Sequence, residues 1–307
     1  MSDPLAHLRA ACAQVAQRAQ HVAIDLPALD RCAASLQHEQ AHTEPNRHAH
    51  LLTGTREELA AFWLTLDAIN FGSGWFPTLR KWRGRSGYFT IAFGLRRRFR
   101  EQGPWSAKEL AGIEPAELAD TLGQDANHVL MGLFAASLND LGRHVEREYD
   151  GRFVGVVDRA GASAIALVSA LATWSCFADT SDYDGIAIPF LKRAQIAAAD
   201  LDLARVAAFD DLNALTMFAD NLVPHVLRLE RVLVFDRNLV ARIESGELID
   251  HGSREEVEIR ACAVHAVELL ATATGRSAAE LDRLLWQRGQ SPAYKAYPRH
   301  RSRSTAY

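Results

Sequence analysis

The sequence has no pair of cysteines at the short spacing that zinc and iron–sulfur sites use. Its four cysteines are scattered along the chain, at Cys12, Cys32, Cys176 and Cys262. Such wide separation also gives no sign of the disulfide framework that staples small secreted proteins. We therefore expect reduced thiols in a cytoplasmic protein, and no cysteine-bound metal.

An excess of positive charge is also missing. Lysine and arginine number 34 against 38 aspartate and glutamate residues, a formal net charge of −4. Proteins that follow a nucleic-acid backbone over a whole face need a basic surface, because phosphate contacts provide most of their affinity. The composition therefore predicts no stable nucleic-acid complex, and any basic function must be confined to one part of the chain.

The chain lacks an apolar run that would cross or enter a membrane. Its start, MSDPLAHLRAACAQ, has an acid and a proline where an export signal would carry basic residues and then an apolar stretch. Residues 161–178 are uncharged, but they consist largely of Ala, Ser, Thr and Gly rather than Leu and Ile. We expect this stretch to be a buried core helix, and we expect no membrane partner.

What the chain does contain is helix after helix. With 48% hydrophobic residues it can bury a large core, and helical periodicity predicts helices over Leu5–Val22 and Leu26–Gln40. Capping boxes of the S/T-x-x-E type open further helices at Thr55 with Glu58, Ser106 with Glu109, Ser253 with Glu256 and Ser277 with Glu280.

Candidates for strands are few, namely 153–158 (FVGVVD) and 82–90. The prediction is a mainly α protein with at most a small peripheral sheet. No repeat or long linker divides the chain, so residues 1–307 are expected to form one domain, and any sub-domain boundary falls near Tyr149.

A histidine-rich stretch follows the second predicted helix. His38, His42, His48 and His50 lie in polar surroundings at irregular spacing. Metal sites built from histidine on a loop usually show regular short spacings. A surface loop is therefore favoured over a metal site, and no metal is predicted for this chain.

The segment Asn70–Tyr88, NFGSGWFPTLRKWRGRSGY, combines a helix end with glycines, aromatic rings and basic residues. Gly72 and Gly74 allow a sharp turn that would present Phe71 and Trp75 together. An aromatic cluster under a loop is one interpretation, and a stacking wall for a flat heterocycle is the other. Its basic residues, Lys81, Arg83 and Arg85, suit either a solvated loop or a phosphate.

The most specific stretch runs from Pro189 to Leu227. Pro189 is expected in the first turn of an apolar helix that Lys192 interrupts. The run LTMFAD stops at Asp220, just before the helix that Pro224 begins. A lysine in an apolar helix usually extends to the surface. An aspartate just before a helix usually caps the free N–H groups of that helix. The same pair, brought together, would instead place a charged lysine beside a carboxylate held ionised by helix N–H groups.

Several motifs together resemble those of the queuosine salvage protein family. They are LDAIN, SGYF, FLKRAQI, LTMFAD followed by VP, REEVEIRA and the C-terminal RSRSTAY, and they extend from about Leu66 to Tyr307. The resemblance implies a fold similar to helical helix-hairpin-helix DNA glycosylases. It also implies an N-glycosidase without a cofactor that hydrolyses queuosine 5′-phosphate to queuine and ribose 5-phosphate.

The resemblance also implies site residues. Asp220 matches the family's essential carboxylate, which stabilises an oxocarbenium-like centre and orients water, and Lys192 matches a lysine that orients this carboxylate or holds phosphate. Substrate binding is assigned to Asn70, Phe71, Trp75, Asp182, Arg193, His300, Arg301 and Arg303. Among these, Asp182, beside Asp179 and Asp184, is the guess for the ammonium of queuine, although a turn without a ligand explains these acids equally well. The basic tail either folds back onto the site or stays solvated.

Two other classes remain open from the sequence. One is a helical DNA glycosylase or lyase that uses Lys192 as a Schiff-base nucleophile, against which the negative net charge counts. The other is a binding module for a nucleotide or tRNA without catalysis, which would tolerate loss of Asp220.

Overall fold

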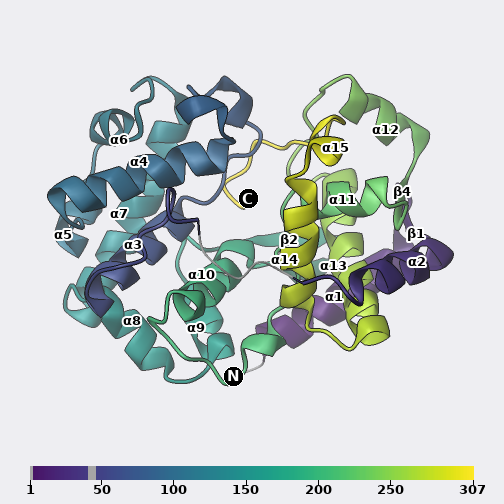
Figure 1. Ribbon diagram of the computed structural model, residues 1–307, viewed down its shortest axis with the longest axis horizontal. Coiled ribbons are helices and arrows are strands. Elements are labelled where there is room, and N and C mark those ends of the chain that lie inside the picture. The colour runs from purple at the N-terminus through teal and green to yellow at the C-terminus, as the bar shows by residue number, and fades with distance from the viewer. Residues whose placement is uncertain (1–2, 41–45) are drawn as a thin grey trace.

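Helices make up most of the structure, a computed structural model in which residues 3–40 and 46–307 are described (Figure 1). The α-helices are α1 (Pro4–Arg18), α2 (Leu26–Leu36), α3 (Arg56–Ala68), α4 (Gly87–Gln102), α5 (Ala107–Ala111), α6 (Pro115–Leu122), α7 (Val129–Tyr149), α8 (Phe153–Ala160), α9 (Ala164–Leu171), α10 (Lys192–Leu203), α11 (Val223–Leu229), α12 (Arg237–Glu244), α13 (Arg254–Thr274), α14 (Ala278–Gly289) and α15 (Pro292–Lys295). Short 3-10 turns are η1 (Phe76–Thr78), η2 (Trp82–Gly84) and η3 (Leu212–Ala214). The prediction of a mainly α protein is confirmed.

The strands form two small antiparallel sheets within the described chain. One pairs β1 (Val22–Ile24) with β4 (Leu233–Phe235), and the other is a hairpin of β2 (Thr180–Tyr183) and β3 (Ile186–Pro189). Neither hairpin strand was predicted from the sequence.

Both predicted strands were wrong. Residues 153–158 begin helix α8, because the carboxylate of Glu57 accepts hydrogen bonds from the backbone N–H groups of Phe153 (2.7 Å) and Val154 (2.8 Å) and so caps the helix. Residues 82–90 contain η2 and the first turn of α4, where the side chain of Ser86 accepts from the N–H of Phe89. The β-branched residues of 153–158 favour a strand, but the long-range contact with Glu57 stabilises a helix there.

Helix boundaries also differ from the expectations. Pro189 does not open a helix: it ends β3 opposite Thr180, and α10 begins at Lys192 after Leu191, whose φ is 51°. The buried helix expected over 161–178 is limited to α9, and α1 and α2 end before the predicted residues. Two of the predicted capping boxes form both of their reciprocal hydrogen bonds, Thr55 with Glu58 and Ser106 with Glu109.

The helices gather in two groups, visible on either side of Figure 1. One group consists of α3 to α10, in which α7 packs against α5, α6 and α3. The other contains α1, α2 and α11 to α15, built around the largely buried helix α13, which packs against α1, α2 and α14. Helix α10 belongs to the first group and α11 to the second, so Lys192 and Asp220 reach the site from opposite groups.

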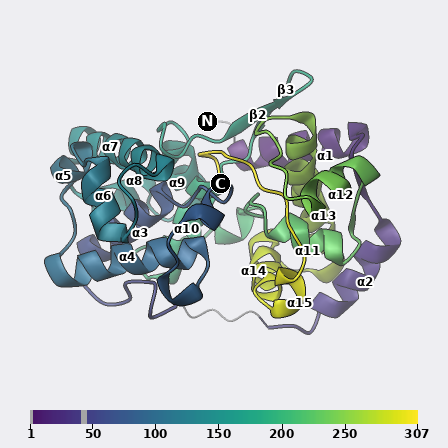
Figure 2. The same cartoon turned by 90° about the horizontal axis from the view of Figure 1, so that it is seen from above.

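The chain after α15 returns to the centre of the molecule, between the two groups (Figures 1 and 2). The carbonyl of Tyr307 accepts a hydrogen bond from the N–H of Gly72 (2.9 Å), and Tyr307 is buried. A Cβ on Gly74 would lie 2.4 Å from the carbonyl oxygen of Ser302, so only glycine lets the tail pack this closely. Of the two alternatives that the sequence leaves open for the basic tail, the structure shows the folded-back one.

Three expectations remain, on the histidine-rich stretch, on membrane helices and on the sub-domain boundary. His42 of the histidine-rich stretch lies outside the described residues. None of the helices in the described part is both long and apolar enough to cross a membrane. The predicted boundary near Tyr149 stays a prediction; Tyr149 is the last residue of α7.

Candidate active site

Lys192 and Asp220 are brought together although 28 positions separate them. Lys192 is buried at the start of α10, and its Nζ donates a hydrogen bond to the carbonyl oxygen of Asn70 (2.8 Å). Burial lowers the pKa of Lys192 to about 8, and the charge of Asp220 is the strongest effect that opposes this shift. The lysine is therefore not a surface charge, and among the carboxylates Asp220 has the largest effect on its pKa.

Asp220 lies two residues before Leu222, the N-cap of α11, and binds backbone N–H groups there through only one of its carboxylate oxygens. Its Oδ1 accepts from the N–H groups of Leu222 (2.8 Å) and Val223 (3.1 Å), at the start of α11. Within the described chain, Oδ2 makes no hydrogen bond, and the residue is only half-buried. The helix N-terminus thus supports the negative charge, while the second oxygen remains able to face a ligand.

The segment that carries Asp220 is fixed at three adjacent residues. The N–H of Phe218 donates to Oδ1 of Asp282 (3.0 Å), and the carbonyl of Ala219 accepts from Nε of Arg260 (3.0 Å). On the other side, Nδ2 of Asn221 donates to the carbonyl of His300 (3.2 Å). These anchors come from α13, α14 and the tail, so the carboxylate is held in place before any ligand binds.

A direct link joins the two family motifs KRAQI and TMFAD. Nε2 of Gln195 donates to Oγ1 of Thr216 (3.0 Å), and the N–H of Thr216 donates to Oε1 of Gln195 (2.9 Å). Both side chains are fully buried. Because buried amides need their partners, this exchange fixes the spacing between the helix of Lys192 and the loop of Asp220.

Three further carboxyl groups surround this pair, and sequence reasoning missed all three as site residues. Burial and then the charge of Asp200 raise the pKa of Asp67 on α3, and burial raises that of Asp200 on α10 to about 7. Burial and then Asp220 raise the pKa of Asp282 on α14. Lys192 interacts with each of them. The position of Asp200 could have been predicted, because residues 192, 196 and 200 are four positions apart and so lie on one face of the helix.

Some residues predicted to bind substrate make contacts within the protein. Nη1 of Arg193 donates to the carbonyl of Ala68 (2.6 Å), and its guanidinium lies 5.0 Å from the ring centre of Phe71. Phe71 is itself buried against Phe134, with ring centres 5.0 Å apart. Phe71 thus belongs to an internal aromatic cluster. Asn70 offers its carbonyl to Lys192 and lies at the site.

The remaining predicted residues lie in two places. In the tail, His300 is buried, Arg301 is half-buried and its carbonyl accepts from the N–H of Ile249 (2.9 Å), and Arg303 is exposed. The guanidinium of Arg303 lies 5.9 Å from the ring centre of half-buried Trp75. Asp182 lies elsewhere, exposed on the β2–β3 hairpin, where its side chain accepts from the N–H of Gly185 (3.2 Å). The structure does not bring Asp182 to the Lys192–Asp220 pair.

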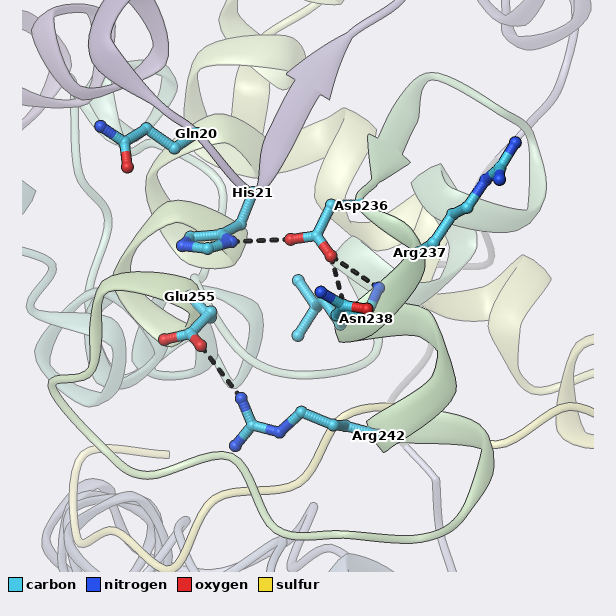
Figure 3. A pocket seen from close by; sticks show the side chains of 8 residues that line it. Gln20, His21, Asp236, Arg237, Asn238, Arg242 and Glu255 are labelled. Atoms are coloured by element: carbon cyan, nitrogen blue, oxygen red, sulfur yellow. Dashed lines mark hydrogen bonds and ion pairs between the residues drawn. The ribbon is translucent and has the colours of Figure 1, made fainter.

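A separate surface pocket lies beside β1 and α12 (Figure 3). Its two carboxylates are already paired: Oδ2 of Asp236 with Nδ1 of His21 (2.6 Å), and Oε1 of Glu255 with Nη1 of Arg242 (3.0 Å). None of its lining residues belongs to the group around Asp220. A cap with a free oxygen beside a buried lysine makes the Asp220 group the better candidate active site.

Fold and site together define a mainly helical protein with a preorganised carboxylate–lysine pair between two helix groups. Residues 50–307 match the family model described as queuosine salvage protein. The chain belongs to the queuosine salvage protein family, as the motifs predicted. The match begins earlier than the motifs did, at His50 rather than near Leu66.

Curated relatives agree with this assignment. A protein of Sphaerobacter thermophilus named queuosine 5′-phosphate N-glycosylase/hydrolase is 36% identical over 96% of this chain and 95% of its own length. Proteins of the same name from Bos taurus and Dictyostelium discoideum are 32% and 37% identical, over 60% and 43% of this chain and 57% and 44% of their own lengths. The similarity to the bacterial relative therefore includes the N-terminal helices.

Proposed function

We propose that this protein hydrolyses the N-glycosidic bond of queuosine 5′-phosphate, releasing queuine and ribose 5-phosphate. The observation that carries the proposal is the geometry of Asp220, with one oxygen bound by backbone N–H groups at the start of α11, the other without a hydrogen bond in the described chain, and the charge of the buried Lys192 interacting with the carboxylate. The names of the relatives supply the substrate. The direct test is release of queuine and ribose 5-phosphate by the purified protein, followed by chromatography and mass spectrometry.

The chemistry of the substrate explains why a carboxylate suffices. Queuine is a 7-deazaguanine and lacks the N7 at which purines are protonated to improve the leaving group, so catalysis acts on the sugar. The ionised Asp220 stabilises the oxocarbenium-like C1′ as its bond to the base breaks. A water oriented by the same carboxylate adds its oxygen to C1′, and the proton it gives up finishes on the departing base.

Lys192 has a supporting role in this mechanism. Its ammonium lies among Asp220, Asp67 and Asp179, and Asp220 has the largest effect of the three on its pKa. A buried cation beside a carboxylate both favours the ionised form and orients it. We assign Lys192 to positioning Asp220 rather than to a covalent step.

The charge of Lys192 predicts an alkaline limit of activity. Below its pKa of about 8 the side chain is an ammonium, and above it the neutral amine no longer orients Asp220. We expect kcat/KM for queuosine 5′-phosphate to fall as pH rises through about 8, because kcat/KM reports ionisations of the free enzyme. The Lys192→Met variant should be slower and should lack this limb; a limb that persists in it belongs to another group, such as the amine of the substrate.

A lowered lysine pKa is also what a Schiff-base lyase needs, so that alternative requires its own test. Nζ of Lys192 donates to the carbonyl of Asn70 and is protonated below pH 8. We therefore expect no covalent adduct when the enzyme turns over queuosine 5′-phosphate at pH 7 with sodium borohydride, as read by intact and peptide mass spectrometry. A known lyase treated in parallel verifies the trapping. A reduced sugar adduct on Lys192 would replace hydrolysis with the lyase mechanism.

A further inference from the structure

Tyr307 is buried between the two helix groups, at the end of the chain marked C in Figures 1 and 2. Its backbone carbonyl contacts the segment that follows α3, in one helix group. Its ring contacts α13, in the other group. Each of these two contacts leads, through one or two further hydrogen bonds, to one member of the Lys192–Asp220 pair.

The backbone contact leads to Lys192. The carbonyl of Tyr307 accepts from the N–H of Gly72 (2.9 Å), and the carbonyl of Gly72 accepts from the N–H of Trp75 (2.9 Å). Gly72 is thus held through both of its backbone polar groups. Two residues earlier, the carbonyl of Asn70 accepts from Nζ of Lys192 (2.8 Å). Tyr307 therefore fixes the short segment that binds the ammonium.

The ring contact leads to Asp220. The guanidinium of Arg260 lies 4.7 Å from the ring centre of Tyr307, and both side chains are buried. A cation over an aromatic ring is attracted more strongly when water is excluded. Nε of Arg260 in turn donates to the carbonyl of Ala219 (3.0 Å), the residue before Asp220. Tyr307 therefore helps to hold the side chain that anchors the carboxylate segment.

The chain before Tyr307 is anchored to both halves of the site as well. The carbonyl of His300 accepts from Nδ2 of Asn221 (3.2 Å), which directly follows the candidate catalytic carboxylate. On the other side, a Cβ on Gly74 would lie 2.4 Å from the carbonyl oxygen of Ser302. This part of the chain thus crosses from one helix group to the other and packs closely against each.

We propose that Tyr307 is a positioning residue that sets how Lys192 and Asp220 lie relative to each other. The inference rests on the proposed function, since the relative position matters for rate only if the pair acts on a substrate. The exchange between Gln195 and Thr216 joins the backbones of the two motifs. Tyr307 acts closer to the charged groups, and a misplacement of about 1 Å can cost about a hundredfold in rate.

Tyr307→Ala and Tyr307→Phe test the role of the ring. Alanine removes the ring that holds this residue against Arg260, whereas phenylalanine keeps it. We expect kcat for queuosine 5′-phosphate to fall about tenfold to a hundredfold in Tyr307→Ala, and Tyr307→Phe to retain most of it. Unchanged kcat in Tyr307→Ala, or equal losses in the two variants, would overturn the proposal.

A double-mutant cycle separates positioning from general stability. In the Lys192→Met background, the loss of kcat caused by Tyr307→Ala should be smaller, because no ammonium is left to position. A loss of stability alone would be independent of the side chain at position 192. The same fold-loss in both backgrounds would therefore show that Tyr307 does not act through Lys192 and would reject the positioning role.

Gly74→Ala displaces the tail without changing Tyr307 or the catalytic pair. The φ of Gly74 is not positive, so alanine can adopt its backbone, and the contact with the backbone of Ser302 is what opposes it. We expect kcat to fall here too. Gly132→Ala, at an open and exposed position on α7, is the matched control and should leave kcat unchanged. Wild-type kcat in Gly74→Ala would contradict the proposal.

Amide hydrogen exchange of the unliganded protein, measured by NMR, keeps the test independent of turnover. In Tyr307→Ala the amides of Gly72 and Leu222 should exchange about fivefold faster, the factor for losing one ordinary hydrogen bond. The amide of Phe153, at the start of α8, should not change. If wild type releases no queuine, the proposed function fails, but faster exchange at both amides still supports the role of Tyr307 in holding the two segments. Unchanged exchange at either amide rejects that role.

Discussion

Replacing Asp220 with asparagine should lower kcat for queuosine 5′-phosphate by about a hundredfold to a thousandfold, the usual cost of losing a preorganised electrostatic group. Asparagine keeps an oxygen that can accept from the N–H groups of Leu222 and Val223. It removes only the negative charge that faces C1′. Queuine release, measured at saturating substrate, gives kcat, and the thermal unfolding midpoint shows whether the fold is intact.

A matched control comes from the start of α12. Asp236 is the N-cap of that helix, with Oδ1 accepting from the N–H groups of Asn238 (2.7 Å) and Leu239 (2.9 Å), and its Oδ2 pairs with Nδ1 of His21 (2.6 Å). Asp236→Asn therefore reproduces the loss of a capping charge away from the candidate active site and should leave kcat unchanged. Retained turnover in Asp220→Asn would remove Asp220 from the mechanism. Equal losses in both variants would assign the effect to capping.

Local sequence rules predicted the parts of the site that depend on helix ends. An apolar run that stops at Asp220, followed by Pro224, predicts a helix start there, and the structure places α11 from Val223. Lys192 was singled out as a charge that interrupts an apolar helix, and the family resemblance then assigned the catalytic carboxylate to Asp220 and a supporting charge to Lys192. The two residues lie together because Gln195 pairs with Thr216, a long-range contact that no local pattern encodes.

The errors have the same physical origin. The β-branched run at 153–158 is a helix because Glu57, almost a hundred positions earlier, caps its N–H groups. The first helical residue of α10 is Lys192 rather than Pro189 because Oδ2 of Asp179 accepts from its N–H (3.1 Å). Asp67 and Asp282 were missed because an acid on a helix is usually solvated, and only packing of α3, α10 and α14 around Lys192 distinguishes them.

Arg260→Met should have the largest effect on stability, because Arg260 connects the parts of the site. It is fully buried on α13, with Nη2 2.7 Å from Oδ2 of Asp179 and Nε donating to the carbonyl of Ala219. Its guanidinium lies 3.9 Å from the ring centre of Phe190 and 4.7 Å from that of Tyr307. One side chain thus contacts the cap of α10, the neighbour of Asp220 and the C-terminal residue.

Methionine fills a similar volume but removes the buried ion pairs of Arg260 with Asp179 (2.7 Å) and Glu256 (3.7 Å). Breaking a buried ion pair on one side typically costs about 3–5 kcal/mol, so the urea midpoint should fall clearly while kcat also falls. In the double variant Arg260→Met with Asp179→Asn, the charge of Asp179 is gone and the amide oxygen can still accept from the N–H of Lys192, while Glu256 keeps its contact with His251 (3.4 Å). Most of the lost stability should therefore return.

Activity should behave differently from stability in that double variant. The anchor on the carbonyl of Ala219 is still missing, so the segment that carries Asp220 stays less well fixed and kcat stays below wild type. Recovery of the urea midpoint without recovery of kcat would separate the two roles of Arg260. If kcat returns together with stability, Arg260 contributes to folding alone, and the position of Asp220 must depend on its bonds to Leu222 and Val223 and on the anchors of its neighbours from Asp282 and Asn221.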